Sequence, residues 1–382
     1  MTLLRLIAMR FFQSANLLGV VLTLYYRAHG LDYTAILSFE IVLSLAMAAA
    51  TLPLGLWADR HGRVRALKCG NATLVVAAVV FLLSRAYWQF LLSDVLYGLA
   101  MAFQSGADTA LLAPGGTRWL SRYAAAGAAA GLLSSLAAGF ILQAAGSRWL
   151  VGLNVGMALL ALLSVATAPD DSPSTAPVAG LRLRPVGEAA RALVAAPWLV
   201  AWTVAGAVAF RLVAINLMFL DLPLWVDAGW HGAWLGLGVT ILYGAGLANL
   251  LAPRVRTRLG ARGALSLSQA GAGAAVLLVP LLRAPWALTA AMAAALALQS
   301  WQGPIVDGVV APALPEPMRA TALSLLDVPA IVVTIACELG VGALADVHLS
   351  LALWASGLAV LAVLPLWWVR ARPRGDAQAA AG

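Results

Sequence analysis

The chain has 382 residues, of which 62% are hydrophobic and only 10% are charged, with a net charge of +8. Soluble domains are about a quarter charged, so this composition excludes an ordinary soluble protein and predicts a polytopic membrane protein. The basic residues are scattered between apolar runs and do not cluster on one face, which argues against nucleic acid as a partner.

Apolar runs long enough to cross a bilayer recur along the chain, since a span needs about 20 apolar residues. The first such runs predict transmembrane helices over 4–26, 34–57, 66–84, 87–113, 122–145 and 148–168. After a polar stretch, further helices are predicted over 197–220, 232–253, 263–282, 286–311, 320–344 and 349–370. The predicted fold class is therefore all-α, with twelve transmembrane helices.

The polar stretch that interrupts this pattern predicts the domain organisation. We expect a six-helix N-terminal half over 1–168, a cytoplasmic linker over 169–197, a six-helix C-terminal half over 198–370 and a cytoplasmic tail over 371–382. The N-terminus runs directly into an apolar stretch without a convincing cleavage site. This favours a retained first helix over a signal peptide.

The distribution of Lys and Arg predicts the orientation, because basic loops tend to stay in the cytoplasm. With the N-terminus inside, nineteen basic residues fall on the cytoplasmic side, namely Arg5, Arg10, Arg60, Arg63, Arg65, Lys68, Arg118, Arg122, Arg182, Arg184, Arg191, Arg254, Arg256, Arg258, Arg262, Arg319, Arg370, Arg372 and Arg374. The opposite side receives four: Arg27, Arg85, Arg148 and Arg283. Both termini are thus expected in the cytoplasm, and we expect the chain in a cell membrane, specifically a bacterial cytoplasmic (inner) membrane.

Residues for metal, redox or catalytic chemistry do not form a recognisable constellation. Cys69 and Cys337 are far apart and lack the spacing of a disulfide framework or a metal site. The histidines fall in loops or at span ends, and no phosphate-binding Gly-Lys-Ser/Thr loop is present. We therefore expect no cofactor, no metal and no enzymatic activity.

A repeat with an offset of 198 residues relates the two halves. Asp59-Arg60-His61-Gly62 corresponds to Thr257-Arg258-Leu259-Gly260, and Ala113-Pro114 corresponds to Ala311-Pro312. Each pair occupies the same loop of its own half. The sequence therefore predicts two halves of the same orientation, related by a parallel pseudo-repeat.

The loop after the second predicted helix reads Gly55-Leu-Trp-Ala-Asp59-Arg60-His-Gly62-Arg63-Val-Arg65. Gly55 lets a neighbouring helix approach, Gly62 permits a tight turn, and Asp59 can accept hydrogen bonds from a helix N-terminus. With the parallel repeat, this loop resembles the signature of the major facilitator superfamily. The resemblance implies a transporter with its substrate site between the halves, and a gating loop of Gly55, Asp59, Arg60, Gly62 and Arg63 that latches them on the cytoplasmic side. The alternative is a basic turn that only sets the topology.

The chain also departs from the pattern it resembles. Thr257 stands where the first half has Asp59, so a weaker latch is expected in the second half. Many proton-coupled exporters carry an Arg four residues before a Gly in helix four, where this chain has Asp94 before Gly98. The sequence therefore leaves the direction of transport open.

Polar and ionisable side chains inside spans are candidate pathway residues, because charges are costly in lipid. We predict substrate- or proton-pathway roles for Asp108, Asp307, Arg211, Glu40, Glu338 and Asn216. The resemblance implies that helices one, four, seven and ten line the cavity, which favours Asp108, Arg211 and Asp307. Asp94 and Asp327 rank lower because they lie near span ends. Caps, interhelical hydrogen bonds or, for Arg211, an ion pair with one of the acids are the structural alternatives.

The predicted function is that of a secondary transporter, moving a small organic solute by alternating access. Proton-coupled export of drug-like or amphipathic compounds ranks first, because the cavity helices are largely apolar with a few acids and aromatics. Proton-coupled uptake of a metabolite and a non-transport receptor or lipid-handling protein of the same fold stay open. The expected partners are the substrate, protons and membrane lipid, and we expect a monomer.

Overall fold

The computed structural model describes residues 2–105, 107–112, 116–170, 191, 193–314 and 319–369. All elements in these ranges are helices, which agrees with the predicted all-α class. The predicted tail and most of the predicted linker lie outside the described residues, so these two expectations stay predictions.

The helices of the first half follow the predicted spans closely. They are α1 (Leu3–Ser14), η1 (Leu18–Val20), α2 (Leu22–Ala28), α3 (Tyr33–His61), α4 (Arg63–Leu83), α5 (Tyr87–Gln104), α6 (Ala107–Leu112), α7 (Gly116–Ala145) and α8 (Ser147–Ala166). The first predicted span is broken after Ser14, and the fourth is broken after Gln104.

The helices of the second half contain more breaks. They are α10 (Pro197–Ala209), η3 (Phe210–Ile215), α11 (Asn216–Asp227), α12 (Ala233–Gly246), η4 (Leu247–Leu251), α13 (Ala252–Leu278), η5 (Val279–Leu281), α14 (Pro285–Gln299), α15 (Gln302–Ala313), α16 (Arg319–Val347), α17 (Leu349–Ala362) and η7 (Leu364–Trp368). The η3 segment is a π-helical turn.

Within the described ranges, nine segments are long and apolar enough to cross a membrane. One of them, Ala233–Leu281, has 49 residues and contains two of the predicted spans. Gly260 divides it, because its φ of 69° is left-handed and interrupts the helix. These segments show an integral membrane protein, while the number of twelve spans stays a prediction.

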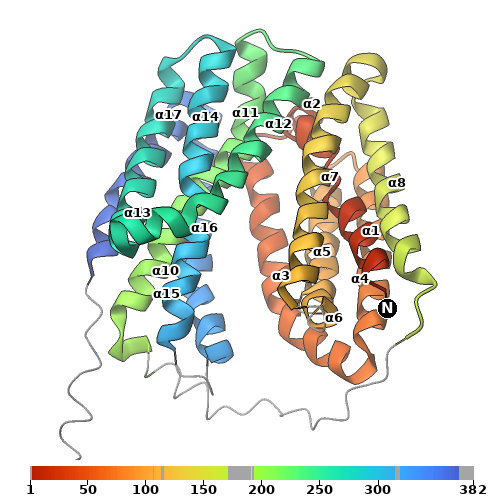
Figure 1. The fold of residues 1–382 in the computed structure, drawn as a ribbon. Helices are drawn as coiled ribbons and strands as arrows, with labels where there is room; N and C mark the ends of the chain where they lie inside the picture. Colours follow the sequence, from red (N-terminus) through yellow and green to blue (C-terminus); the bar gives the residue numbers. More distant parts are fainter. Residues whose placement is uncertain are drawn as a thin grey trace, which may run out of the picture. The chain divides into compact units, whose positions relative to one another are not determined.

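Contacts between helices group the chain into two compact units. Unit 1 comprises Met1–Ala179, Met218–Gly244 and Arg283–Thr289, and unit 2 comprises Gly180–Leu217, Ala245–Leu282 and Ala290–Gly382. In unit 1, α3 packs on α5, α4 on α5 and α8, and α1 on α7 and α8, which forms the helix bundle seen in Figure 1. In unit 2, α10 packs on α16, and α13 packs on α15 and α17.

Each unit has its own buried core. In unit 1, Tyr26, Phe39 and Phe90 pack their rings at centroid distances of 5.0 to 6.1 Å. In unit 2, Trp202 makes an edge-to-face contact with Trp367, whose Nε1 donates to the buried Gln269. Other large apolar side chains are exposed, among them Leu52, Leu83, Phe140, Leu163 and Leu250. Such exposure is expected where a helix faces lipid and not water.

The turn at Gly62 confirms the sequence expectation for this residue. Its φ of 102° ends α3 and allows α4 to begin at the next residue, a conformation that favours glycine. Gly260, at the repeat-related position, also has a left-handed φ. Gly55 behaves differently, because a Cβ placed there would meet nothing within 4 Å. The close helix approach expected at Gly55 is therefore not found among the described residues.

Candidate functional site

Unit 1 contains a cavity of about 520 Å³. Side chains from α1 to α5, α7, α8, α11 and α12 line it. The apolar part of its wall includes Leu18, Leu22, Phe39, Leu43, Leu74, Phe81, Met218 and Phe219. The polar part includes Arg10, Gln13, Ser14, Asn16, Tyr26, Glu40, Ser93, Asp94, Tyr97, Asn154 and Tyr243. Mostly apolar walls with a few convergent polar groups are typical of small-molecule sites of this size.

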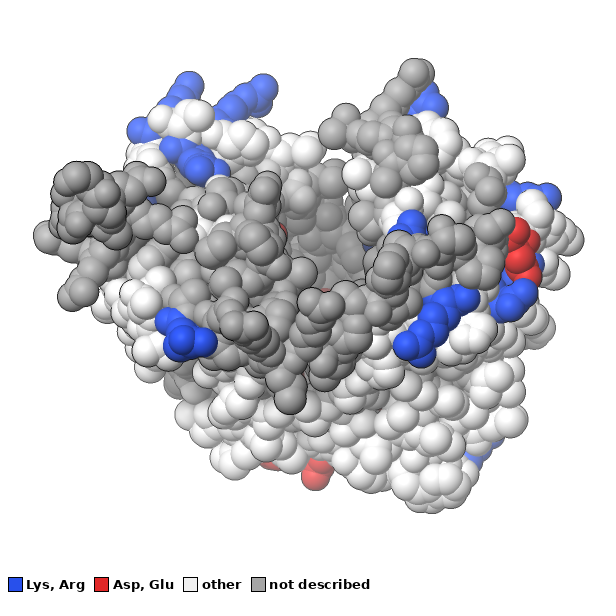
Figure 2. Space-filling model, turned by 90° about the horizontal axis from the view of Figure 1, so that it is seen from below, with Lys and Arg blue, Asp and Glu red and all other residues white. Residues whose placement is uncertain are grey.

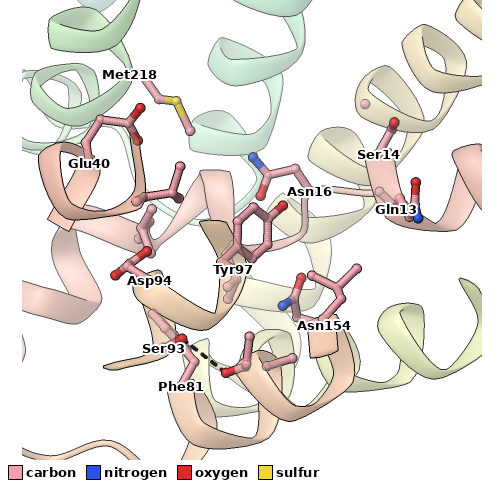
Figure 3. A pocket seen from close by; sticks show the side chains of 18 of the residues that line it. Gln13, Ser14, Asn16, Glu40, Phe81, Ser93, Asp94, Tyr97, Asn154 and Met218 are labelled. Atoms are coloured by element: carbon pink, nitrogen blue, oxygen red, sulfur yellow. Dashed lines mark hydrogen bonds between the residues drawn. The ribbon is translucent and has the colours of Figure 1, made fainter. Parts of the chain in front are cut away.

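Two carboxylates lie on the same side of the cavity. Figure 3 shows Glu40 and Asp94 there, with Gln13, Ser14 and Asn154 on the other side and Tyr97 between them. Glu40 belongs to α3 and Asp94 to α5, the two helices that pack together. The sequence ranked Asp94 lower because of its place near a span end, whereas the structure puts it in the wall of the cavity, and its pathway role stays a prediction.

The polar side of the cavity is built at the break between α1 and η1. Gln13 Nε2 donates to Asn71 Oδ1 at 2.8 Å, and Asn16 Nδ2 donates to the Tyr243 hydroxyl at 3.0 Å. Asn16 Oδ1 also accepts from the backbone N–H of Gly19 at 2.9 Å, which fixes the bend. These side chains are held in place before any solute binds, so they can offer donors and acceptors at fixed positions.

Sequence reasoning missed Arg10, Gln13 and Ser14 as lining residues. A signal for them exists, because positions 10, 13 and 14 have the i, i+3, i+4 spacing that puts side chains on one face of a helix. In a span that is otherwise apolar, such a polar stripe indicates a face turned toward the protein interior or a cavity. No comparable signal exists for Asn154, which is isolated in the apolar helix α8.

Arg10 and Asp108 belong to one group of side chains in unit 1. The Arg10 guanidinium lies 5.3 Å from the centroid of the Tyr123 ring, within range of a cation–π interaction. The Tyr123 hydroxyl donates to Asp108 Oδ2 at 2.8 Å. Asp108 is not among the residues that line the cavity. Its pathway role stays a prediction, and the structure identifies Tyr123 as its hydrogen-bond partner.

The remaining predicted pathway residues lie in unit 2. Arg211 Nη1 and Glu338 Oε1 form an ion pair at 3.0 Å, with the Glu338 side chain only 1% exposed. Of the alternatives for Arg211, the structure thus shows a pair with an acid. Asn216 Nδ2 donates to Ser356 Oγ at 3.2 Å, and Asp307 is exposed on α15. Arg211 lies in the π turn η3, a feature frequent at functional sites.

The predicted gating loop is followed by two basic residues of α4 that bind an acid beyond the end of α8. The Asp59 side chain lies outside the described side chains, and Arg60 is exposed. Lys68 and Arg65 bind Asp170 at 2.8 and 3.0 Å, and their hydrogen bonds lower the pKa of the Asp170 carboxyl below its ordinary value of 3.8. In the view of Figure 2, more Lys and Arg than Asp and Glu side chains are visible. The cytoplasmic position of the loop and its role as a latch between the halves stay predictions.

Comparison with known protein families shows to which family this chain belongs. A family model described as the Major Facilitator Superfamily matches residues 6–282, well over half of the chain. The chain belongs to the Major Facilitator Superfamily. The resemblance seen in the sequence is thereby confirmed, and the chain has the fold of the superfamily's transporters. A search of curated proteins found no match.

Solved transporter structures share this superfamily fold. A crystal structure of the nucleoside transporter NupG superposes with a TM-score of 0.79 at 14% identity, covering 96% of this chain and 98% of that one. The peptide transporter POT in complex with sulfate gives 0.74 at 14% identity, covering 96% and 93%. A POT family transporter in complex with 5-aminolevulinic acid gives 0.72 at 14% identity, covering 96% and 95%. At this identity the likeness shows the fold alone. Within the described residues, no group of His, Cys, Asp and Glu could hold a metal ion.

Proposed function

We propose that this superfamily member is a secondary transporter that moves a small organic solute by alternating access, coupled to protons. The observation that carries the proposal is the cavity of about 520 Å³ inside a bundle of membrane-crossing helices. A cavity of this size can enclose most of a drug-sized molecule. In a superfamily of transporters, a cavity within the helix bundle is the natural place for the solute.

The chemistry of the wall favours an amphipathic or drug-like solute. Leucines, phenylalanines and Met218 form a large apolar part of the wall, beside the polar groups named above. A sugar needs a dense polar lining that these residues do not supply. Export is the favoured direction, because amphipathic compounds enter cells through the lipid and a transporter is needed chiefly to remove them. From the distribution of Lys and Arg, we also propose that both termini lie in the cytoplasm and that the protein lies in a bacterial inner membrane.

Uptake of a metabolite is the second candidate. The amides of Gln13, Asn16 and Asn154 offer hydrogen bonds on one side of the cavity, which suits a solute with several polar groups. The nucleoside and peptide transporters that share the fold carry polar metabolites according to their names. A receptor or lipid-handling role would use the same cavity without moving the solute.

Transport in proteoliposomes tests the proposal. The purified full-length protein is reconstituted, a proton gradient of either direction is imposed, and the movement of a panel of radiolabelled solutes is measured. The panel contains amphipathic cations, anions and neutral compounds, together with a nucleoside and a dipeptide. Proton-driven movement that a protonophore abolishes supports the proposal, and the gradient that drives accumulation gives the direction. If the protein binds members of the panel but moves none of them, the receptor or lipid-handling role replaces transport.

A further inference from the structure

The charges of the cavity in unit 1 are unevenly placed. Its charged lining residues are Arg10, Glu40 and Asp94, so acidic groups outnumber basic ones. Glu40 and Asp94 lie together on one side in Figure 3. Arg10 lies over the ring of Tyr123, whose hydroxyl donates to Asp108. The Arg10 guanidinium therefore lies beside a group that contains a carboxylate of its own, and the other two charged residues of the wall are both acids.

The Asp94 carboxylate also has an unused acceptor. Its Oδ2 is buried, and no hydrogen bond from a described residue reaches it. Burial of a charged oxygen without a hydrogen bond or counter-charge is unfavourable, so such groups are normally satisfied by a partner. Because Asp94 lines the cavity, a positive group bound there would lie beside this carboxylate and offset the cost of its burial through its charge.

Aromatic rings complete the same part of the wall. Phe39 and Tyr97 flank the two acids along their helices, one residue before Glu40 and three residues after Asp94. Tyr26 packs on Phe39 at a centroid distance of 5.0 Å and on Phe81 at 5.8 Å, and all of these rings line the cavity. Aromatic faces attract cations. Tyr97 is 37% exposed and can offer its ring to a cation, whereas Tyr26, Phe39 and Phe81 are almost fully buried.

We propose that Glu40 and Asp94 form a cation-recognition site and that the solute of this transporter is an organic cation with an apolar body. The proposal deepens the proposed function and rests on it, because the bound cation is a solute only if the protein transports it. The positive group lies against the two carboxylates and the ring of Tyr97. The apolar body fills the space lined by Leu18, Leu22, Leu74 and Met218.

Binding of two probes of equal shape and opposite charge tests the site directly. Tetraphenylphosphonium and tetraphenylborate have nearly the same size, and neither gains or loses a proton. We expect the wild-type protein in detergent to bind the cation, and the borate at least about tenfold more weakly. Equal affinity for the two probes would overturn the proposal, because it would show that shape and apolar contact alone decide binding.

Charge-neutralising variants assign the effect to the two residues. Glu40→Gln and Asp94→Asn should each weaken tetraphenylphosphonium binding by about tenfold, the order expected for the loss of one charge-assisted contact. Asp94→Glu should restore most of the affinity. The matched control is Asp227→Asn, because Asp227 is exposed at the end of α11 and does not line the cavity. Monodispersity and melting temperature establish that each variant is folded. If a folded Glu40→Gln/Asp94→Asn double variant binds the cation as wild type does, the site is wrong.

Transport of the same probes separates this inference from the proposed function. If the protein moves neutral or anionic solutes with a proton gradient while the double variant leaves tetraphenylphosphonium binding unchanged, the cation site fails and the transporter stands. If cation binding depends on both carboxylates but no solute is moved in any gradient, the site stands and the transporter fails.

Discussion

Arg211 and Glu338 form a largely buried ion pair in unit 2, whose loss has a predictable cost. Glu338→Leu leaves the Arg211 guanidinium without its carboxylate while only 17% of the Arg211 side chain is exposed. Breaking a buried pair from one side costs about 3–5 kcal/mol, whereas replacing both partners by apolar residues is often nearly neutral. We therefore expect the single variant to melt well below wild type and Arg211→Leu/Glu338→Leu to recover most of the loss. Equal melting temperatures for the single and double variants would contradict this account.

Asp170 gives a prediction for pH dependence at the surface. Because Lys68 and Arg65 lower its pKa, the stability from these contacts is fully present above the ordinary carboxyl pKa and is lost as the pH falls through the lowered value. We expect Asp170→Asn to melt slightly below wild type at pH 7, and the difference to vanish in strongly acidic buffer. Asp227→Asn, which removes an exposed acid from α11, serves as the control. A difference between the Asp170 variant and wild type that persists at low pH would show that the effect is not electrostatic.

The ionisable residues inside spans were identifiable from sequence, but their partners were not. Hydropathy alone marks Glu40, Arg211 and Glu338, because each interrupts an apolar run. The pairing of Arg211 with Glu338 across 127 positions depends on how α10, η3 and α16 pack, which no local pattern encodes. The place of Asp94 in the cavity wall likewise depends on how α5 packs against α3, which no local pattern encodes.

At the scale of elements, a glycine pair brings two helices of unit 1 into close contact. A Cβ on Gly236 of α12 would lie 2.6 Å from the Cα of Gly139 and 2.7 Å from the carbonyl oxygen of Ser135, both on α7. Gly236→Ala therefore forces the helices apart, and we expect a loss of about 1–3 kcal/mol. Gly244→Ala on the same helix is the matched control, because a Cβ there meets nothing within 4 Å and alanine favours helix. Thermal melting of both variants in one detergent checks the difference, and an equal effect of both would rule out the close contact as its cause.

Helix positions follow from the sequence far better than helix breaks do. Spans are marked by long apolar runs, because lipid requires every backbone group to be bonded within the helix. The breaks after Ser14 and Gln104 and the π turn at Phe210–Ile215 carry no proline or charge cluster that would announce them. They depend instead on side chains such as Asn16, which bonds the backbone of Gly19 and so stabilises a bend that the apolar pattern conceals.

At the scale of the whole molecule, the family could be recognised in the sequence from one loop and one repeat. Gly62 and Gly260 are related by the repeat offset, and both adopt the left-handed backbone that a tight turn requires. The cavity was not readable in the same way, because nine helices contribute to its wall and each contributes only a few side chains. The solute therefore has to be inferred from structure, while the fold could be inferred from sequence.

The orientation of the molecule is testable by cysteine labelling. On a background of Cys69→Ser and Cys337→Ser, His61→Cys and His231→Cys place single thiols at two exposed positions. The excess of basic residues predicts that a membrane-impermeant maleimide labels position 231 in intact cells and position 61 only after permeabilisation. Labelling of position 61 in intact cells would show that the topology is the reverse of the predicted one, with both termini outside the cytoplasm.

Proton coupling is the last property of the whole molecule, and Asp108 is the first residue at which to test it. Neutralising a carboxylate that exchanges a proton fixes it in the protonated-like state, so uphill transport fails while downhill exchange of solute persists. Asp108→Asn should show this pattern, since the amide oxygen can still accept from the Tyr123 hydroxyl that now donates at 2.8 Å. Tyr123→Phe is the matched control, because it removes the hydrogen bond and keeps the charge, and we expect it to retain gradient-driven transport. If Asp108→Asn accumulates solute as wild type does, Asp108 does not carry the proton, and the same pair of assays then applies to Asp307→Asn, Glu40→Gln and Glu338→Gln. If all four variants keep proton-driven accumulation, coupling through these carboxylates is wrong.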